Sequence, residues 1–215
     1  MKSTNKNTLR LVTSGVLIGL GTILSMIKIF AIPFGGSVTL FSMVPLLVLG
    51  YMYKIKWGLL CGFVYGVLQM ILGATMSSAF VGLTGISILL MVILDYLLSY
   101  MSLGLSGMFK NKIKNDKASI IAGSSIAVLL RFVCHFLSGW ILWGSYADSW
   151  FSDMGNSFGN FFISHFTGQL LAICYSFLYN ALYLVPEYII SIIALLIIMN
   201  IKPLAKYIIG ENSRI

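Results

Sequence analysis

The sequence predicts an all-α integral membrane protein: one domain over residues 1–215, a bundle of six transmembrane helices with both termini in the cytoplasm. Hydrophobic residues make up 59% of the chain and charged residues only 9%, whereas a soluble domain averages about 25% charged residues. The apolar residues fall into segments of membrane-spanning length, and the basic residues fall between them. This composition leaves no stretch for a separate soluble module.

Six apolar segments are long enough to cross a bilayer. A hydrocarbon core of about 30 Å needs roughly 20 residues of helix, and hydropathy places the spans at residues 9–30, 38–53, 57–74, 86–109, 119–143 and 169–200.

Two outer connections stand out. Residues 75–85 are rich in small side chains and are interpreted as a loop or a short re-entrant stretch, whereas residues 144–168 contain many aromatic side chains of the kind that suit the membrane–water interface. The second connection therefore predicts either an amphipathic helix on the outer surface or a lid over a site.

The lysines and arginines fix the orientation. Of the 14 in the chain, only Lys28 and Arg131 lie outside the termini and the connections that follow the second and fourth spans. The opposite connections contain Asp148 and Asp153 but no lysine or arginine. By the positive-inside rule, both termini face the cytoplasm.

Several function classes are disfavoured. The net charge of +8 comes from short loops between apolar spans rather than from one polar face, which argues against a nucleic-acid partner. No G-x-x-x-x-G-K-[ST] motif is present, so energy for uphill transport must come from a partner or an ion. The cysteines lie inside predicted spans without metal-ligand spacing, and they are interpreted as small apolar residues: Cys61, Cys134 and Cys174.

Ionisable residues inside spans are costly and therefore indicate a site. Asp95 lies about ten residues, or roughly 15 Å, from the outer end of its span. His135 lies at a similar depth, with Arg131 one turn deeper and Gly139 and Trp143 successive turns outward on the same face. Two alternatives stay open: Asp95 forms a helix-packing hydrogen bond, and Trp143 anchors the helix at the interface.

The last span adds a tyrosine stripe, Tyr175, Tyr179 and Tyr183, and a polar amide, Asn180, whose hydrogen bonds must be satisfied. Asn180 lies about 140° from Tyr175 on an ideal helix, so both face one cavity only at its edges or where the backbone is irregular. Pro186 is the candidate for such a kink.

Together these side chains suit a small aromatic cation, which an anion, an imidazole, an indole and tyrosines would hold by charge pairing, stacking and cation–π attraction. Glu187 lies deeper and is expected to pair with Arg131 or Lys28 rather than with the ligand. The sequence contains only two histidines and no nucleophile–base pair or metal-ligand cluster. We therefore predict a binding protein rather than an enzyme, with no metal and no cofactor.

The chain resembles the thiamine-specific substrate-binding (S) components of energy-coupling factor (ECF) transporters, the ThiT family. The resemblance covers most of the chain and is specific in combination. The matching blocks are Gly35-Gly-Ser-Val-Thr39 with Met43-Val-Pro45, Leu94-Asp95-Tyr96 with Gly104-Leu-Ser-Gly107, Leu130-Arg131-Phe-Val-Cys-His135-Phe-Leu-Ser-Gly139, Gly144-Ser-Tyr146-Ala, and Tyr175-Ser-Phe-Leu-Tyr179-Asn180-Ala-Leu-Tyr183-Leu-Val-Pro186.

The resemblance implies a protein of the bacterial cell membrane that binds thiamine from outside and needs a transmembrane coupling subunit and two ATPases for transport. It implies that Asp95 pairs with the ligand, with Tyr96 beside it. It also implies that His135 and Trp143 contact and stack on the ligand rings, and that further residues complete the pocket: Gly139, Tyr175, Asn180 and, at its floor, Arg131.

The resemblance further implies that the first helix packs on the coupling subunit through a small-xxx-small motif, which Gly15 and Gly19 fit because small residues permit close helix approach. The alternative for these glycines is packing within the molecule. Residues 75–85 lack the family's polar element, and connection 144–168 is longer than expected. Three other functions therefore stay open: an S component for another vitamin, one for a hydroxymethylpyrimidine-like thiamine precursor, and a membrane protein outside transport, whether a scaffold or an intramembrane enzyme.

Overall fold

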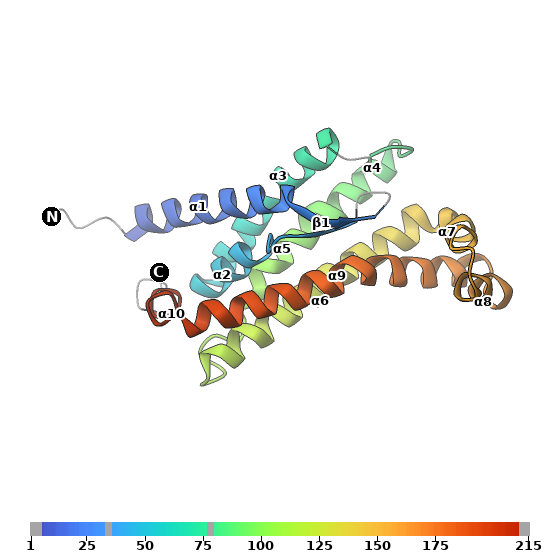
Figure 1. The fold of residues 1–215 in the computed structure, drawn as a ribbon. Coiled ribbons are helices and arrows are strands. Elements are labelled where there is room, and N and C mark those ends of the chain that lie inside the picture. Colours follow the sequence, from blue (N-terminus) through green and yellow to red (C-terminus); the bar gives the residue numbers. More distant parts are fainter. Residues whose placement is uncertain (1–5, 33–35, 77–79, 211–215) are drawn as a thin grey trace.

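The structure is a computed structural model that describes residues 6–32, 36–76 and 80–210 of the chain. The molecule is an elongated bundle whose long helices run roughly along a common direction (Figure 1). The first described helix begins and the last one ends at the same end of this bundle.

Within the described residues, five helical stretches are long and apolar enough to cross a membrane. The all-α membrane bundle is thereby confirmed, whereas the count of six spans is not. The five stretches are α1 (Lys6–Met26), α3 (Ile55–Met76), the run Ile86–Gly107, α6 (Asp116–Trp143) and α9 (Gly168–Asn200).

The prediction of a single helical span over residues 38–53 is wrong. The structure has strand β2 (Ser37–Thr39), which pairs antiparallel with β1 (Lys28–Ala31), followed by the short helix α2 (Val44–Met52). The nine residues of α2 extend only about 13 Å at 1.5 Å per residue. All of them are buried, and non-helical backbone at membrane depth is tolerated where protein surrounds it. The turn expected over residues 31–36 falls partly on residues 33–35, outside the described residues.

The stretch Ile86–Gly107 is not a uniform α-helix. It consists of α4 (Ile86–Met91), the π-helix η2 (Val92–Leu98), α5 (Ser99–Leu103) and the 3₁₀ segment η3 (Gly104–Gly107). A π-helix forms i→i+5 bonds and is frequent at functional sites. This one contains Asp95, and hydrophobic periodicity alone did not reveal it.

Glycines allow this irregular helix to lie close to α3. Gly58 on α3 faces Gly104 on η3, and a Cβ placed on either would collide with the backbone of the other. Small residues permit such close approach between membrane helices, where packing drives association.

The outer connection forms two short helices, α7 (Ala147–Asp153) and α8 (Ser157–His165), after the 3₁₀ turn η4 (Gly144–Tyr146). Phe151 of α7 is fully buried, and its ring stacks on Phe162 of α8 with centroids 4.7 Å apart. Of the other outer segment, residues 77–79 lie outside the described residues, and α4 begins at Ile86.

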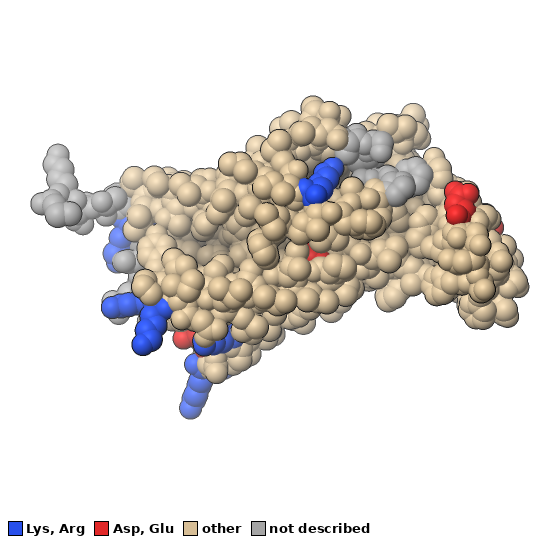
Figure 2. All heavy atoms as spheres, viewed as in Figure 1, with Lys and Arg blue, Asp and Glu red and all other residues tan. Residues whose placement is uncertain are grey.

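Most of the basic side chains visible in Figure 2 gather at the end of the bundle where α1 begins and where α10 (Lys202–Ile209) lies. Acidic side chains appear at the opposite end, near α7. Lys110 Nζ donates to the backbone oxygen of Tyr51 at 2.9 Å, and thus ties the fourth connection to α2. The positive-inside rule predicts that this basic end faces the cytoplasm.

Candidate binding site

A cavity of about 420 Å³ lies between β2, α3, the 86–107 helix, α6 and α9. All eight residues expected to bind substrate line it, although they come from three different helices. Their contact with a substrate stays a prediction. The eight are Asp95, Tyr96, Arg131, His135, Gly139, Trp143, Tyr175 and Asn180.

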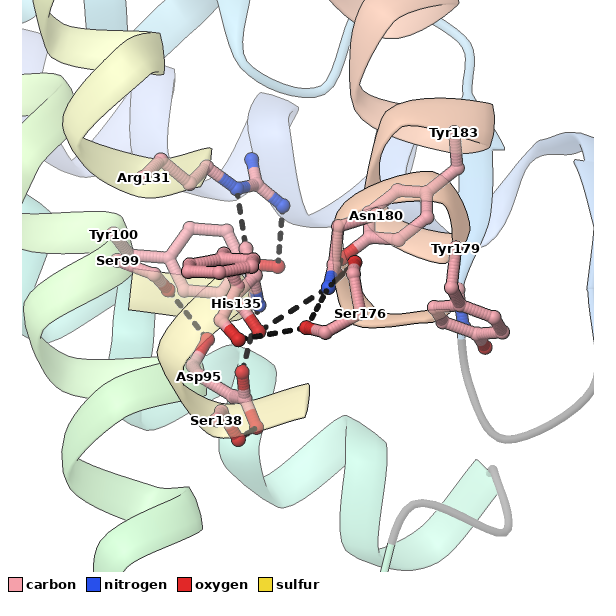
Figure 3. Close-up of polar contacts among 12 residues, drawn as sticks. Asp95, Ser99, Tyr100, Arg131, His135, Ser138, Ser176, Tyr179, Asn180 and Tyr183 are labelled. Atoms are coloured by element: carbon pink, nitrogen blue, oxygen red, sulfur yellow. Dashed lines mark hydrogen bonds and ion pairs between the residues drawn. The ribbon is translucent and has the colours of Figure 1, made fainter. Parts of the chain in front are cut away.

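Asp95 is positioned by the π-helix and by two partners on α6. Its Oδ1 lies 2.8 Å from His135 Nδ1, and its Oδ2 accepts a hydrogen bond from Ser138 Oγ at 2.5 Å (Figure 3). The side chain remains 19% exposed. Asp95 therefore does accept a helix-packing hydrogen bond, from Ser138 of α6. Its carboxylate nevertheless lines the cavity.

Tyr96, the next residue, also lines the cavity. Its ring stacks on Phe80 of the outer segment with centroids 5.9 Å apart. Its hydroxyl packs closely against Gly73 of α3, where a Cβ would collide with it. Tyr96 therefore closes the wall between α3 and the π-helix.

Arg131 is the buried cation of the site, with 5% of its surface exposed. Its Nε donates to His135 Nε2 at 3.3 Å, and its Nη2 donates to the Tyr100 hydroxyl at 3.4 Å. The guanidinium also lies over the Tyr100 ring, 4.5 Å from the centroid, a favourable cation–π contact. Figure 3 shows Arg131 reaching toward both partners.

Asn180 joins α9 to α6. Its Nδ2 donates to the backbone oxygens of His135 at 3.2 Å and Ser176 at 2.8 Å, and its Oδ1 accepts from the Tyr183 hydroxyl at 2.8 Å. Both amide hydrogens are therefore used within the protein, and the second lone pair of Oδ1 is what Asn180 offers a ligand.

The tyrosine stripe of α9 faces the cavity, and α9 continues as a helix through Pro186. Tyr175 and Asn180 both line the cavity without a break in the helix. Tyr179, which was not among the predicted site residues, also lines it, and its hydroxyl accepts a hydrogen bond from the backbone nitrogen of Gly36 at 3.2 Å. Its position four residues after Tyr175 and four before Tyr183 could have identified Tyr179 as a site residue.

Trp143 lines the outer part of the cavity, and its ring lies 5.9 Å from that of Tyr146. It is therefore more than an interfacial anchor. Gly139 lines the cavity as well, and a Cβ there would collide with Ser176 Oγ. Close approach of α9 therefore requires this glycine.

The inner end of the cavity contains two hydroxyl residues that sequence reasoning missed, Thr39 and Ser42, and both contact Glu187. Glu187 accepts hydrogen bonds from Thr39 Oγ1 and from Ser42 Oγ, the latter at 3.1 Å. The expected pairing of Glu187 is wrong, because neither Arg131 nor Lys28 forms an ion pair with it. Thr39 and Ser42 could have been identified as partners of a buried polar group, because they are hydroxyl residues inside an apolar segment. Among the described residues, no three His, Cys, Asp or Glu side chains gather as a metal site.

The glycines of α1 lie on an open face. A Cβ built on Gly15 or on Gly19 would meet nothing within 4 Å. Packing within the described part of the molecule therefore does not account for them, and contact with a coupling subunit stays a prediction.

The chain is similar to known proteins along most of its length. The model of a family described as "Thiamine transporter protein (Thia_YuaJ)" matches residues 11–206. The curated thiamine transporter ThiT of Bacillus subtilis (strain 168) is 26% identical over 210 residues, which cover 93% of this chain and 94% of that protein. A solved structure of ThiT from Listeria monocytogenes shares the fold, with a TM-score of 0.62 and 19% identity over 93% of this chain and 98% of that one.

Proposed function

This chain belongs to the thiamine transporter protein family, and we propose that it is the high-affinity thiamine-binding S component of an ECF-type uptake transporter. It is a multi-pass protein of the bacterial cell membrane that serves thiamine transport. The proposal assigns substrate loading from outside to this chain and ATP hydrolysis to partner subunits.

One observation carries the ligand assignment: the cavity contains a carboxylate, Asp95, that forms no ion pair with any lysine or arginine in the described part of the chain. Its described partners are His135 and Ser138. A carboxylate that has no cationic lysine or arginine beside it attracts a cation and repels an anion in a low-dielectric interior. Thiamine supplies a permanent thiazolium charge, whereas a vitamin bearing a carboxylate would be rejected.

The remaining lining suits the two rings of thiamine. Trp143 and Tyr175 provide aromatic faces for stacking and cation–π contact. The volume of about 420 Å³ falls in the range of small-molecule sites, which is roughly 300–1,000 Å³. His135, Tyr96, Gly139 and Asn180 complete the walls, and Arg131 forms the floor.

Delivery requires partners of the chemistry implied by the family: a transmembrane coupling subunit and two ATPases. The open face of α1 around Gly15 and Gly19 supports this part of the proposal, because small residues allow a partner helix to approach closely. Thiamine binds from outside, the loaded protein joins the coupling module, and ATP hydrolysis there drives release inward.

The test is a calorimetric titration of the purified protein with thiamine and, in parallel, with the neutral 4-amino-5-hydroxymethyl-2-methylpyrimidine. Saturable binding of thiamine that is at least about tenfold tighter, equal to about 1.4 kcal/mol, supports the proposal. Tighter binding of the neutral pyrimidine would assign the chain to a precursor instead. Co-expression with a coupling subunit and ATPases tests the second part, and failure of a complex to form would remove the ECF assignment.

A further inference from the structure

Three side chains form a continuous hydrogen-bonded row along the cavity wall. Arg131 Nε lies 3.3 Å from His135 Nε2, and His135 Nδ1 lies 2.8 Å from Asp95 Oδ1. Arg131 and His135 are one helical turn apart on α6, so their relative position is fixed by the helix. Asp95 is presented to them from the π-helix η2.

The chemistry of this row determines which atom holds the proton. A guanidinium has five N–H donors and no acceptor, so His135 Nε2 must accept the hydrogen bond from Arg131. The imidazole is then neutral, with its proton on Nδ1, and that N–H donates to Asp95. With Ser138 donating to the other oxygen, Asp95 is held as an ionised carboxylate that only accepts.

We propose that Arg131 is a positioning residue that acts through His135, holding the imidazole in its neutral Nδ1–H form so that Asp95 keeps its full negative charge for a cationic substrate. The inference rests on the proposed function for the identity of that substrate. It assigns Arg131 an indirect role that differs from contact with the ligand.

The surroundings explain why Arg131 is needed. The titratable groups in contact with His135 are Asp95 of the 86–107 helix, Arg131 of α6 and Tyr183 of α9, and Tyr100 contacts Arg131. The other titratable residues that line the same cavity are Lys28, Tyr96, Tyr175, Tyr179 and Glu187. Of these, Arg131 alone contacts Nε2. If it is removed, Nε2 is free to take a proton, and an imidazolium 2.8 Å from Asp95 cancels the carboxylate charge.

Nitrogen-15 NMR of histidine-labelled protein reads the tautomer directly. The chain contains only two histidines, so His165→Gln assigns the signals. At about pH 8 we expect the His135 signals of a neutral imidazole protonated at Nδ1. An Nε2–H tautomer or an imidazolium in the wild type at about pH 8 would overturn the inference without using any ligand.

Binding provides the second readout. In Arg131→Met, thiamine affinity should fall at least about fivefold further than in the wild type as the pH drops from about 8 to about 6, because the imidazolium neutralises Asp95. Because both proteins are titrated with the same ligand, any protonation of thiamine itself changes both affinities equally and cancels in the comparison. Arg131→Lys, which retains a cation, should restore a flatter profile.

The double variant Arg131→Met/His135→Gln assigns the pH effect to the imidazole. A glutamine amide can donate to Asp95 and cannot take a proton in this range, so the profile should become flat again. If Arg131→Met lowers thiamine affinity equally at all pH values, Arg131 has only a structural role, and the proposal that it acts through His135 is refuted. If the wild type does not bind thiamine, the proposed function fails, while the tautomer measurement still decides this inference.

Discussion

Trp150 of α7 meets Tyr175 of α9 edge to face, with ring centroids 5.3 Å apart and an interplanar angle of 71°. The Trp150 ring also lies edge to face with the Tyr179 ring, with centroids 6.4 Å apart. Tyr175 is 2% exposed and lines the cavity, so the outer connection supports the site from behind. An amphipathic helix that lies only on the membrane surface would not make these contacts.

Trp150→Ala should therefore weaken thiamine binding although Trp150 does not line the cavity. Aromatic pairs of this kind contribute about 0.5–1.5 kcal/mol each, so two lost pairs predict a loss of about tenfold in affinity, measured by calorimetry. Trp140→Ala is the matched control, because Trp140 bonds Gln169 away from the cavity. Equal effects of the two variants would show that α7 does not support the site.

Asp95→Asn tests the charge. The substitution keeps a side chain of similar shape but removes the negative charge, so thiamine should lose at least about tenfold in affinity. The neutral hydroxymethylpyrimidine should lose far less. Parallel titrations of both ligands give the comparison, and equal losses would count against charge pairing.

Trp143 should report ligand stacking by fluorescence. Thiamine should quench the emission of the wild type saturably, and Trp143→Phe should lose most of that signal while Trp140→Phe retains it, because Trp143 lines the cavity. Full quenching in Trp143→Phe would move the stacking position to another indole, with Trp150 the next to test.

Replacement of Gly15 and Gly19 by leucine should separate binding from transport. A Cβ at either position meets nothing within 4 Å, so thiamine affinity and thermal stability should remain within about twofold and about 0.5 kcal/mol of the wild type. Uptake by vesicles containing the complete transporter should fall strongly because the partner helix cannot approach. Normal uptake would place the coupling interface elsewhere.

Thr39→Val should destabilise the protein through Glu187. Removing the hydroxyl takes a hydrogen bond from a carboxylate that is 1% exposed, and leaving a buried polar group short of a partner costs about 1–3 kcal/mol. Thermal unfolding in detergent measures the loss, and Ser149→Ala, at an exposed position of α7, is the control. An unchanged midpoint would mean that Ser42 alone satisfies the carboxylate.

Part of the site could be read from the sequence because helical spacing is local. Arg131, His135, Gly139 and Trp143 recur every four residues, which places them on one face of α6 wherever that helix packs. The cost of ionisable groups in a membrane marked Asp95 as their counterpart. Basic residues in short connections likewise predict the orientation.

The tertiary structure decided what depends on contacts between distant segments. Hydropathy predicted a span over residues 38–53, because a segment buried in protein is as apolar as one that faces lipid. In the fold, its strand pairs with β1, and its short buried helix packs chiefly against η3, α1 and α3. The π-helix at Asp95 and the hydroxyl partners of Glu187 are set by neighbours far along the chain. The sequence by itself determined the membrane class and one wall of the cavity, whereas the complete cavity and the pairing of its charges needed the fold, because side chains from different helices meet only there.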